Sequence, residues 1–254
     1  MIALISPAKT MRQVSTAASA IFSEPRFGDS TAQIVGCMLR YSATELVEIF
    51  KVSAPIAREL RSRFLAMMDD EVVPLPAVES YDGVVYKHFK GDGDFVLPEQ
   101  EYLQAHVRIS SLLYGLLRPM DCIKPYRMEG FVRLADSDCR VDKFWRDRQT
   151  QLLIDDVRQQ GGELVYLASR EEQNAFNWRE VLRSVRVIDI EFLQYKGDKL
   201  RQVVIYTKMA RGEMIRFMID RRVTNPEELK EFEWSGYRYD EARSTADKWV
   251  WVMG

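Results

Sequence analysis

Cationic and hydroxyl side chains gather in loops where strands are expected to end. The apolar run 2–5 stops at Ser6 and Pro7, and Lys9 and Thr10 follow at once. Because proline has no backbone N–H to donate to a neighbouring strand, it marks a strand terminus. In open α/β sheets ligands bind at the carboxyl ends of strands. The loop is therefore a candidate anion-binding site, and the alternative from spacing alone is that Lys9 is simply solvated.

The segment 114–127 has the composition most typical of a binding loop. It holds two prolines, two arginines and two tyrosines in 14 residues. A strand is predicted over 107–113, and the chain turns out of it through Arg118 toward Tyr126 and Arg127. Loops at strand ends carry binding and catalytic residues more often than core positions do. These three side chains are therefore further candidates.

The elements that must position these loops are predicted from hydrophobic periodicity and turn signals. We expect two or three helices over 31–68, a helix over 141–160, a strand over 163–168 that delivers Ser169 to its carboxyl end, a hairpin of 186–195 with 200–207, a helix over 210–223 and a short helix from Pro226. The stretch 72–98 is expected to be irregular except for a short segment near 84–86, because it is interrupted by prolines and glycines. The sequence predicts one α/β domain over 1–254 with a mixed sheet and a helical N-terminal subregion.

The helical subregion contains a predicted helix hairpin. Ser42 and Glu45 have the spacing of a capping box, and Pro55 suits the first turn of the next helix, so the connection is short. Free N–H groups at a helix start attract phosphate oxygens. The candidate phosphate contacts are Ser53, Arg58 and Arg61. The turn lacks the glycines that let backbone approach phosphate closely, so ordinary helix packing is the competing interpretation.

Charge is distributed unevenly along a chain whose net charge is −2. Nine acidic residues and two lysines lie between Asp69 and Glu101, whereas seven basic and two acidic residues lie between Lys199 and Arg222. A basic face can therefore exist under a nearly neutral total. Of the 36 bases 25 are arginine, whose planar guanidinium suits phosphate, although a general composition bias would give the same count.

Metal, redox and membrane functions find little support in the sequence. The three cysteines, Cys37, Cys122 and Cys139, have no CxxC spacing, and His88 and His106 are the only histidines. We therefore expect no metal, no other cofactor and no cysteine redox switch. There is no run of 18 apolar residues and the apolar N-terminal run is short, which favours a cytoplasmic protein that does not enter a membrane.

Several multi-residue blocks occur in one order along nearly the whole chain. They are ISPAKT at 5–10, YGLLRPMD at 114–121, PYRME at 125–129, FW at 144–145, LAS at 167–169, ARGEMIRF at 210–217, NPEEL at 225–229 and FEWSGY at 232–237. In these blocks and their order the sequence resembles the YaaA-type peroxide-stress proteins of bacteria.

The resemblance implies a compact α/β protein with a positively charged cleft and a helix-hairpin-helix element. It also implies DNA binding, which we expect to be weak, non-specific and salt-sensitive, and a role in limiting damage by free iron. The cleft candidates that it carries over are Ser6, Lys9, Thr10, Arg118, Tyr126, Arg127, Ser169, Lys208, Arg211 and Arg216. We expect a monomer, although the sequence leaves the oligomeric state open.

An alternative function is an enzyme that acts on a phosphorylated or nucleobase-containing small molecule in the same cleft. Lys9, Arg118 and Arg127 would then hold the anionic group. Under either interpretation we expect these three cations and Arg211 to meet in one concave site. The sequence leaves open whether the protein is an enzyme.

Four positions depart from the family pattern. Asp82 stands where the family has lysine, Val84 where it has aspartate, Tyr166 where it has asparagine and Glu172 where it has tyrosine. These changes remove a base, an acid and a phenol from the candidate pocket. Chemistry that needs those groups is expected to be lost or altered, while the arginine-rich features persist.

Overall fold

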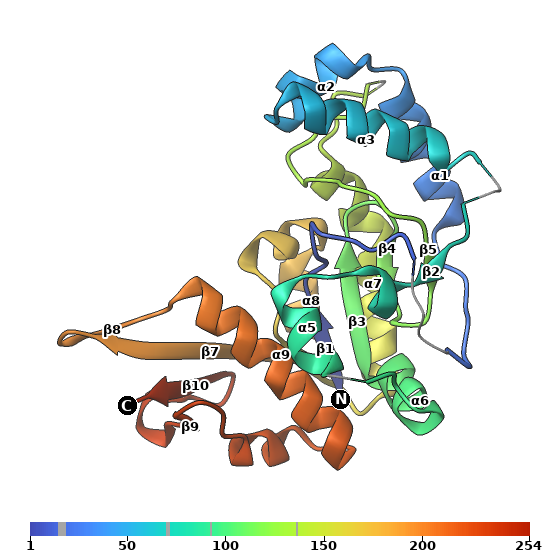
Figure 1. The fold of residues 1–254 in the computed structure, drawn as a ribbon. Helices are drawn as coiled ribbons and strands as arrows, with labels where there is room; N and C mark the ends of the chain where they lie inside the picture. The colour runs from blue at the N-terminus through green and yellow to red at the C-terminus, as the bar shows by residue number, and fades with distance from the viewer. Residues whose placement is uncertain (15–18, 70–71, 92, 136) are drawn as a thin grey trace.

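The computed structural model describes residues 1–14, 19–69, 72–91, 93–135 and 137–254 (Figure 1). Its strands are β1 (Ile2–Ile5), β2 (Leu75–Pro76), β3 (Val107–Ser111), β4 (Gly115–Leu117), β5 (Cys122–Ile123), β6 (Glu163–Tyr166), β7 (Arg186–Lys196), β8 (Lys199–Arg201), β9 (Tyr237–Tyr239) and β10 (Lys248–Met253). Its α-helices are α1 (Gly28–Leu39), α2 (Ala43–Phe50), α3 (Ala54–Ala66), α4 (Ala77–Ser80), α5 (Val84–Lys90), α6 (Leu97–His106), α7 (Val141–Gln159), α8 (Trp178–Ser184) and α9 (Val204–Arg221). Short 3-10 helices are η1 (Arg170–Ala175), η2 (Pro226–Glu231) and η3 (Glu241–Arg243).

The described residues form a mixed sheet of eight strands in the order β4-β3-β1-β6-β7-β10-β9, with β8 paired to β7, and a separate two-stranded sheet of β2 and β5. The neighbours from β3 to β10 are parallel, whereas β4, β8 and β9 are antiparallel to their partners. A parallel order of β3-β1-β6-β7-β10 is one of the two common doubly wound arrangements. The chain leaves β1 toward β3 and later returns to β6 on the other side, so the topological switch point lies between β1 and β6.

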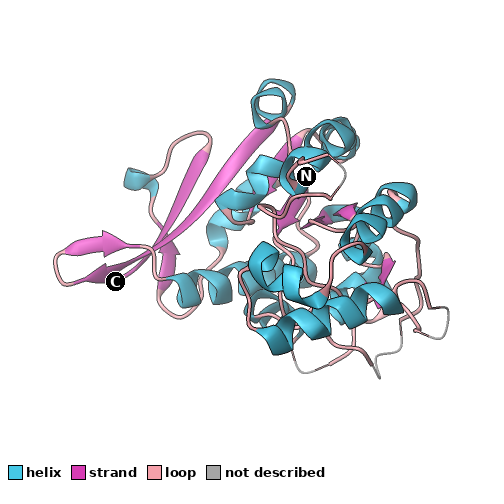
Figure 2. Cartoon of the chain, turned by 90° about the horizontal axis from the view of Figure 1, so that it is seen from above, coloured by secondary structure: helices cyan, strands magenta, loops and turns pink. Residues whose placement is uncertain are grey.

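Helices cover both faces of this sheet, as the sequence predicts for an α/β protein. Helix α6 packs on β1 and β3, α9 packs on β7 and α5 packs on α9 (Figure 1). Helices α7 and α8 pack on each other and on β6 and β7 respectively. All four residues of β1 are buried, which explains why its sequence IALI is continuously apolar rather than alternating. Figure 2 shows the strands as a twisted sheet flanked by helices.

The predicted helix hairpin is confirmed as α2 and α3. Ser42 and Glu45 form the capping box, and Pro55 lies in the first turn of α3. Lys51 adopts a left-handed conformation with φ of 54°, so the chain turns between the helices without glycine. The hairpin stands with α1 above the sheet in Figure 1. Its use as a DNA-binding helix-hairpin-helix stays a prediction.

The expectation that 72–98 is irregular is wrong. The segment carries β2, α4 and α5, and α6 begins at its end. Gly83 and Gly91 lie at the two ends of α5 and so bound this helix rather than interrupt it. Pro98 lies in the first turn of α6, where proline costs no helical hydrogen bond. Residues 70, 71 and 92 of the acidic stretch lie outside the described residues.

The hairpin of β7 and β8 is confirmed, but its second strand is shorter than expected. Strand β8 ends at Arg201, and the residues predicted to continue it begin α9 at Val204. A short apolar run has no period that separates a strand from a helix. The predicted helix over 210–223 therefore begins six residues earlier, and Pro226 opens the 3-10 helix η2.

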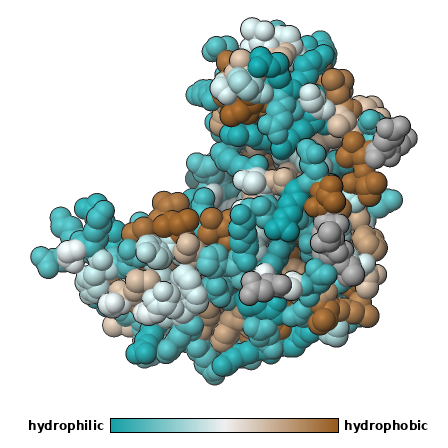
Figure 3. Space-filling view, viewed as in Figure 1, coloured by the Kyte–Doolittle hydropathy of each residue, from teal (hydrophilic) through white to brown (hydrophobic). Residues whose placement is uncertain are grey.

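The side of the molecule seen in Figure 3 is hollowed between the helical part above and the arm formed by β7, β8 and β10. In the part of the chain that the structure describes, no helix is both long and apolar enough to cross a membrane.

Candidate functional site

The switch point between β1 and β6 is held together by two serines. Ser6 follows β1 and Ser169 lies just after β6, and the N–H of Ser169 donates to the hydroxyl oxygen of Ser6 at 2.8 Å. From α5, the hydroxyl of Tyr86 donates to the carbonyl of Ser6 at 2.9 Å. Because ligands of doubly wound sheets bind at such a switch point, this is where a candidate site is expected.

Two of the departures from the family pattern join this serine pair. Tyr166 donates its hydroxyl to the carbonyl of Ser169, and Ser169 donates its hydroxyl to the carboxylate of Glu172. Burial raises the pKa of Glu172, although hydrogen bonds from Ser169 and Ser6 oppose the shift. The phenol and the carboxyl are therefore built into the switch point.

A cavity of about 460 Å³ opens beside Glu172. The loops after β1, β3 and β6 and the first turn of α7 all contribute to its lining. The lining residues are Pro7, Ala8, Lys9, Leu112, Tyr126, Arg127, Met128, Glu129, Gly130, Phe131, Arg140, Asp142, Glu171, Glu172 and Asn174. Three cations and four carboxylates are among them, so this cavity is polar but not uniformly basic.

Lys9 and Arg127 meet at one carboxylate in the cavity wall. The Nζ atom of Lys9 lies 2.9 Å and the Nη2 atom of Arg127 lies 3.3 Å from the same oxygen, Oε1 of Glu129. The Nε atom of Arg127 is buried and has no hydrogen-bond partner among the described residues. Because a carboxylate already joins the two cations, an anionic ligand would have to compete with Glu129 for them.

The loop after β1 also borders the helix hairpin. A hollow of about 240 Å³ is lined on one side by the loop and on the other by α3. Its lining residues are Lys9, Thr10, Met11, Ile56, Glu59, Leu60, Arg63 and Arg127. The structure therefore brings a strand-end loop and a helix hairpin to one surface hollow, although they lie far apart in the sequence.

Tyr126 is 4 % exposed and lines the 460 Å³ cavity mainly through its buried ring. Its hydroxyl oxygen lies 2.7 Å from the hydroxyl oxygens of both Tyr81 and Ser111. Burial raises the pKa of Tyr126 to about 12, against hydrogen bonds that lower it. The phenol is therefore neutral at physiological pH and part of a buried chain of hydroxyl groups.

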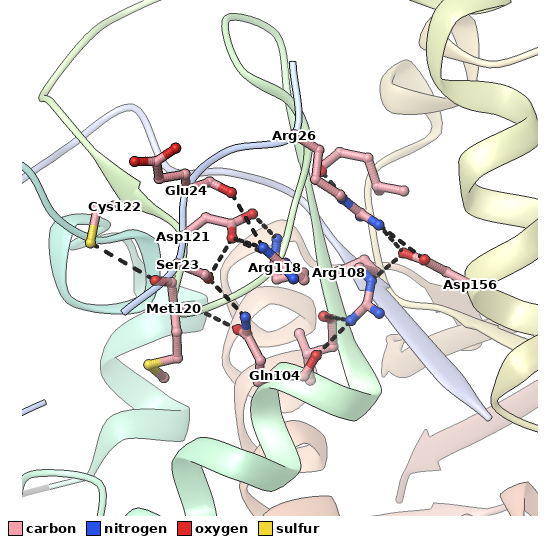
Figure 4. A network of polar contacts seen from close by, with 12 residues as sticks. Ser23, Glu24, Arg26, Gln104, Arg108, Arg118, Met120, Asp121, Cys122 and Asp156 are labelled. Atoms are coloured by element: carbon pink, nitrogen blue, oxygen red, sulfur yellow. Dashed lines mark hydrogen bonds and ion pairs between the residues drawn. The ribbon is translucent and has the colours of Figure 1, made fainter. Parts of the chain in front are cut away.

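Arg118 lies in a separate polar network (Figure 4). Its guanidinium binds the fully buried carboxylate of Asp121 at 2.9 Å and donates to the carbonyl of Glu24. Arg211 lines another hollow, beneath α9. The four cations expected to converge are therefore divided: Lys9 and Arg127 meet, whereas Arg118 and Arg211 lie elsewhere.

The remaining candidates differ in how far the protein already uses them. Arg61 donates to the carbonyls of Leu39 and Tyr41, which satisfies acceptors at the end of α1. Arg216 is paired with Glu99 and Asp220. By contrast, the exposed candidates Ser53, Arg58 and Lys208 have no side-chain hydrogen bond or ion pair to a described residue.

The other two departures lie near the start of α5. Asp82 forms ion pairs with Arg12 at 2.8 Å and with Lys87 at 3.5 Å, and Val84 is the first residue of the helix. Asp82 thus forms ion pairs with two cationic side chains at a position where the family pattern has a lysine. No group of three or more His, Cys, Asp or Glu side chains placed to hold a metal ion occurs among the described residues.

Sequence reasoning missed Glu129 and Thr207. Glu129 closes the PYRME block, so its place in that block was the available signal, but only the structure shows that it binds both cations. Thr207 was missed because its segment was assigned to a strand from the sequence. In the structure Thr207 lies on α9 and lines the hollow beneath that helix.

The fold is a doubly wound α/β sheet with a polar cavity beside its switch point. The family model described as "Peroxide stress protein YaaA" matches residues 1–243, and the chain belongs to this family. It is similar to UPF0246 proteins of Parabacteroides distasonis, 42 % identical over 254 residues and 100 % of both chains, and of Bacteroides thetaiotaomicron, 40 % identical over 255 residues, 100 % of this chain and 99 % of the relative. A UPF0246 protein of Porphyromonas gingivalis is 36 % identical over 256 residues, which is 100 % of both chains. Membership of the family supports a role in peroxide stress.

Proposed function

We propose that this protein binds duplex DNA weakly and without sequence preference, and that this binding helps limit free-iron damage during peroxide stress. The observation that carries the proposal is the shared hollow between α3 and the loop of Lys9 and Thr10. A helix start and a cationic loop on one surface are the groups that contact phosphates without reading bases.

The charges around this hollow suit exchange with phosphate. The Lys9 side chain is 68 % exposed, so its ion pair with Glu129 is worth little and is readily replaced. Arg58 is exposed near the start of α3 and has no ion pair among the described residues. The hollowed face of Figure 3 offers an open surface to a duplex.

A salt titration of labelled duplex DNA tests the proposal. Three to five phosphate contacts predict a log–log salt slope of about −2.7 to −4.5 between roughly 50 and 200 mM salt. Lys9→Ala and Arg58→Ala should each weaken binding and reduce the slope by about 0.9. Arg183→Ala is the matched control, because Arg183 is exposed on α8, away from the hollow.

Binding that is flat with salt, or absent at low salt in folded protein, would contradict DNA binding. The same variants should then be compared for survival of peroxide in cells. Loss of protection by Lys9→Ala and Arg58→Ala, but not by Arg183→Ala, would tie the stress role to this surface.

A small-molecule enzyme is the second candidate, and the cavity at the switch point favours it. Its volume of about 460 Å³ falls within the range of small-molecule sites. The carboxyl group of Glu172, whose pKa is raised by burial, faces this cavity and is suited to proton transfer. Turnover of a phosphorylated or nucleobase-containing compound that is lost in Glu172→Gln would favour this function.

A further inference from the structure

A second hollow of about 330 Å³ lies under α9, beside the switch point. Hydroxyl and cationic side chains of α9 form one wall, and acidic side chains of β7 form another. The residues that matter are Ser169, Asp189, Glu191, Thr207, Lys208 and Arg211. The hollow is at the lower end of the size range for small-molecule sites, which is larger than inorganic phosphate needs.

Two polar atoms in this wall are buried without a partner. Thr207 is 2 % exposed, and its hydroxyl oxygen has no hydrogen-bond partner among the described residues. The Nε atom of Arg211 is also buried without a hydrogen-bond partner among the described residues. Thr207 and Arg211 are four residues apart, so they lie on one face of the helix. Because buried polar groups are almost always hydrogen-bonded, two such groups lining one hollow are suited to bind the oxygen atoms of a ligand.

Arg211 is unusual among the arginines of its own helix. Arg216, one turn further on, is held by Glu99 and Asp220. Arg211 makes no hydrogen bond or ion pair to any residue in the described parts of the chain, and burial lowers its pKa despite the nearby acids. The Arg211 side chain is half-buried with a buried Nε atom, and a guanidinium with no bonded carboxylate is suited to hold an anion in its fork.

The opposite wall offers acceptors. Asp189 and Glu191 lie on β7. Glu191 is ion-paired with Lys248 at 2.7 Å, whereas the carboxylate of Asp189 has, among the described residues, only a 3.9 Å contact to the exposed Arg170. Carboxylates in the wall would repel a second phosphate but accept hydrogen bonds from sugar hydroxyls, as acidic residues of dinucleotide sites do. The combination therefore selects a ligand with one anionic group and several hydroxyl groups.

We propose that this hollow binds a sugar monophosphate, either free or as part of a nucleoside monophosphate. Arg211 and Thr207 donate to the phosphate oxygens, Lys208 adds a cation at the exposed rim, and Asp189 accepts from the sugar hydroxyls. The site is independent of the proposed DNA surface and separate from the 460 Å³ cavity of the small-molecule alternative, with which it shares no lining residue.

Isothermal titration of the full chain with ribose 5-phosphate tests the proposal, with inorganic phosphate, ribose and adenosine monophosphate in separate arms. Ribose 5-phosphate should bind more tightly than inorganic phosphate or ribose. Comparing its affinity with that of adenosine monophosphate shows whether the site prefers a free sugar phosphate or a nucleotide. Arg211→Met should weaken binding about tenfold or more, and Thr207→Val, which keeps the shape, by about three- to tenfold. Arg183→Met, on the exposed side of α8, should bind like the wild type.

The proposal is overturned if neither sugar phosphate gives heat or raises the melting temperature. It is also overturned if inorganic phosphate binds as tightly as both sugar phosphates, or if folded Arg211→Met and Thr207→Val bind like the wild type. Thr207→Val keeps the shape of the side chain and should therefore fold. Its binding decides the test if Arg211→Met does not fold. No DNA is present in these titrations, so their failure leaves the duplex salt titration to decide DNA binding.

Discussion

The N–H of Ser169 donates to the hydroxyl oxygen of Ser6 at 2.8 Å, although 163 residues separate the two. The bond joins the loops that leave β1 and β6, where the parallel strands diverge around the switch point. Strand pairing places Ala3 opposite Val165, so both loops emerge at the same edge of the sheet. The bond thus fixes one wall of the cavity relative to the other.

Ser6→Ala removes this acceptor and leaves the N–H of Ser169 without its partner. Loss of a hydrogen bond at this partly buried site costs about 0.5–1.5 kcal/mol, so we expect the free energy of unfolding to fall by that amount. Urea unfolding measures it. Ser62→Ala, on the exposed side of α3, is the control and should change stability by less than about 0.5 kcal/mol. Equal effects of the two substitutions would show that the bond contributes nothing.

Glu172 should make stability depend on pH. Burial raises the pKa of Glu172 above its ordinary value of 4.5, so the folded protein binds this proton more tightly than the unfolded chain does. Ionisation of Glu172 therefore costs stability. The cost is absent below the unfolded pKa and complete once the pH exceeds the folded pKa.

We therefore expect Glu172→Gln to gain stability relative to the wild type as the pH rises through the window above 4.5. Urea unfolding at a series of pH values measures the difference. A constant difference between Glu172→Gln and the wild type would contradict the prediction.

Asp156 is the shared carboxylate of a buried ion-pair network (Figure 4). Its Oδ2 atom lies 2.9 Å from Nη1 of Arg26 and 2.5 Å from Nε of Arg108. Asp156→Ala leaves both guanidinium groups without their counter-charge, so we expect a loss of about 3–5 kcal/mol in urea unfolding. Asp155→Ala is the matched control, because the one side-chain partner of Asp155 among the described residues is Gln151. A loss no larger than that of the control would refute the network's role.

The sequence predicted local structure better than it predicted contacts. The run 2–5, the capping box at Ser42 and the hairpin turn before α3 depend on neighbouring residues, and all three were confirmed. The partner of Lys9 is Glu129, and Arg118 reaches the carbonyl of Glu24 as well as its near neighbour Asp121. No spacing in the sequence encodes the two distant pairings.

The same reason explains the missed helix α5. Its residues 84–90 lie between glycines, and its stability comes from packing against α9, a helix more than 100 residues later. Tertiary packing of this kind overrides local turn signals.

The crossing of α5 and α9 depends on Gly212. A Cβ atom at this position would lie 2.4 Å from the carbonyl oxygen of Val85 and 2.6 Å from Cβ of His88. We expect Gly212→Ala to destabilise the protein by about 1–3 kcal/mol, because overpacking outweighs the better helix propensity of alanine. Gly36→Ala in α1 is the matched control. Nothing lies within 4 Å of its new Cβ, so thermal unfolding should show a gain of about 0.5–1 kcal/mol. A similar gain from Gly212→Ala would mean that the helices can separate at no cost.

Peroxide protection should not depend on the cysteines. Cys37 is buried, Cys122 and Cys139 are half-buried, and all three are free thiols. Burial raises the pKa of Cys122, the only one that the sequence places among bases, so little reactive thiolate forms near neutral pH. We expect the triple variant Cys37→Ala, Cys122→Ser, Cys139→Ser to protect cells against peroxide as the wild type does. Arg58→Ala is the comparison, since the DNA proposal expects it to lose protection. A triple variant that unfolds at the wild-type temperature and yet fails to protect would establish a thiol switch in this protein.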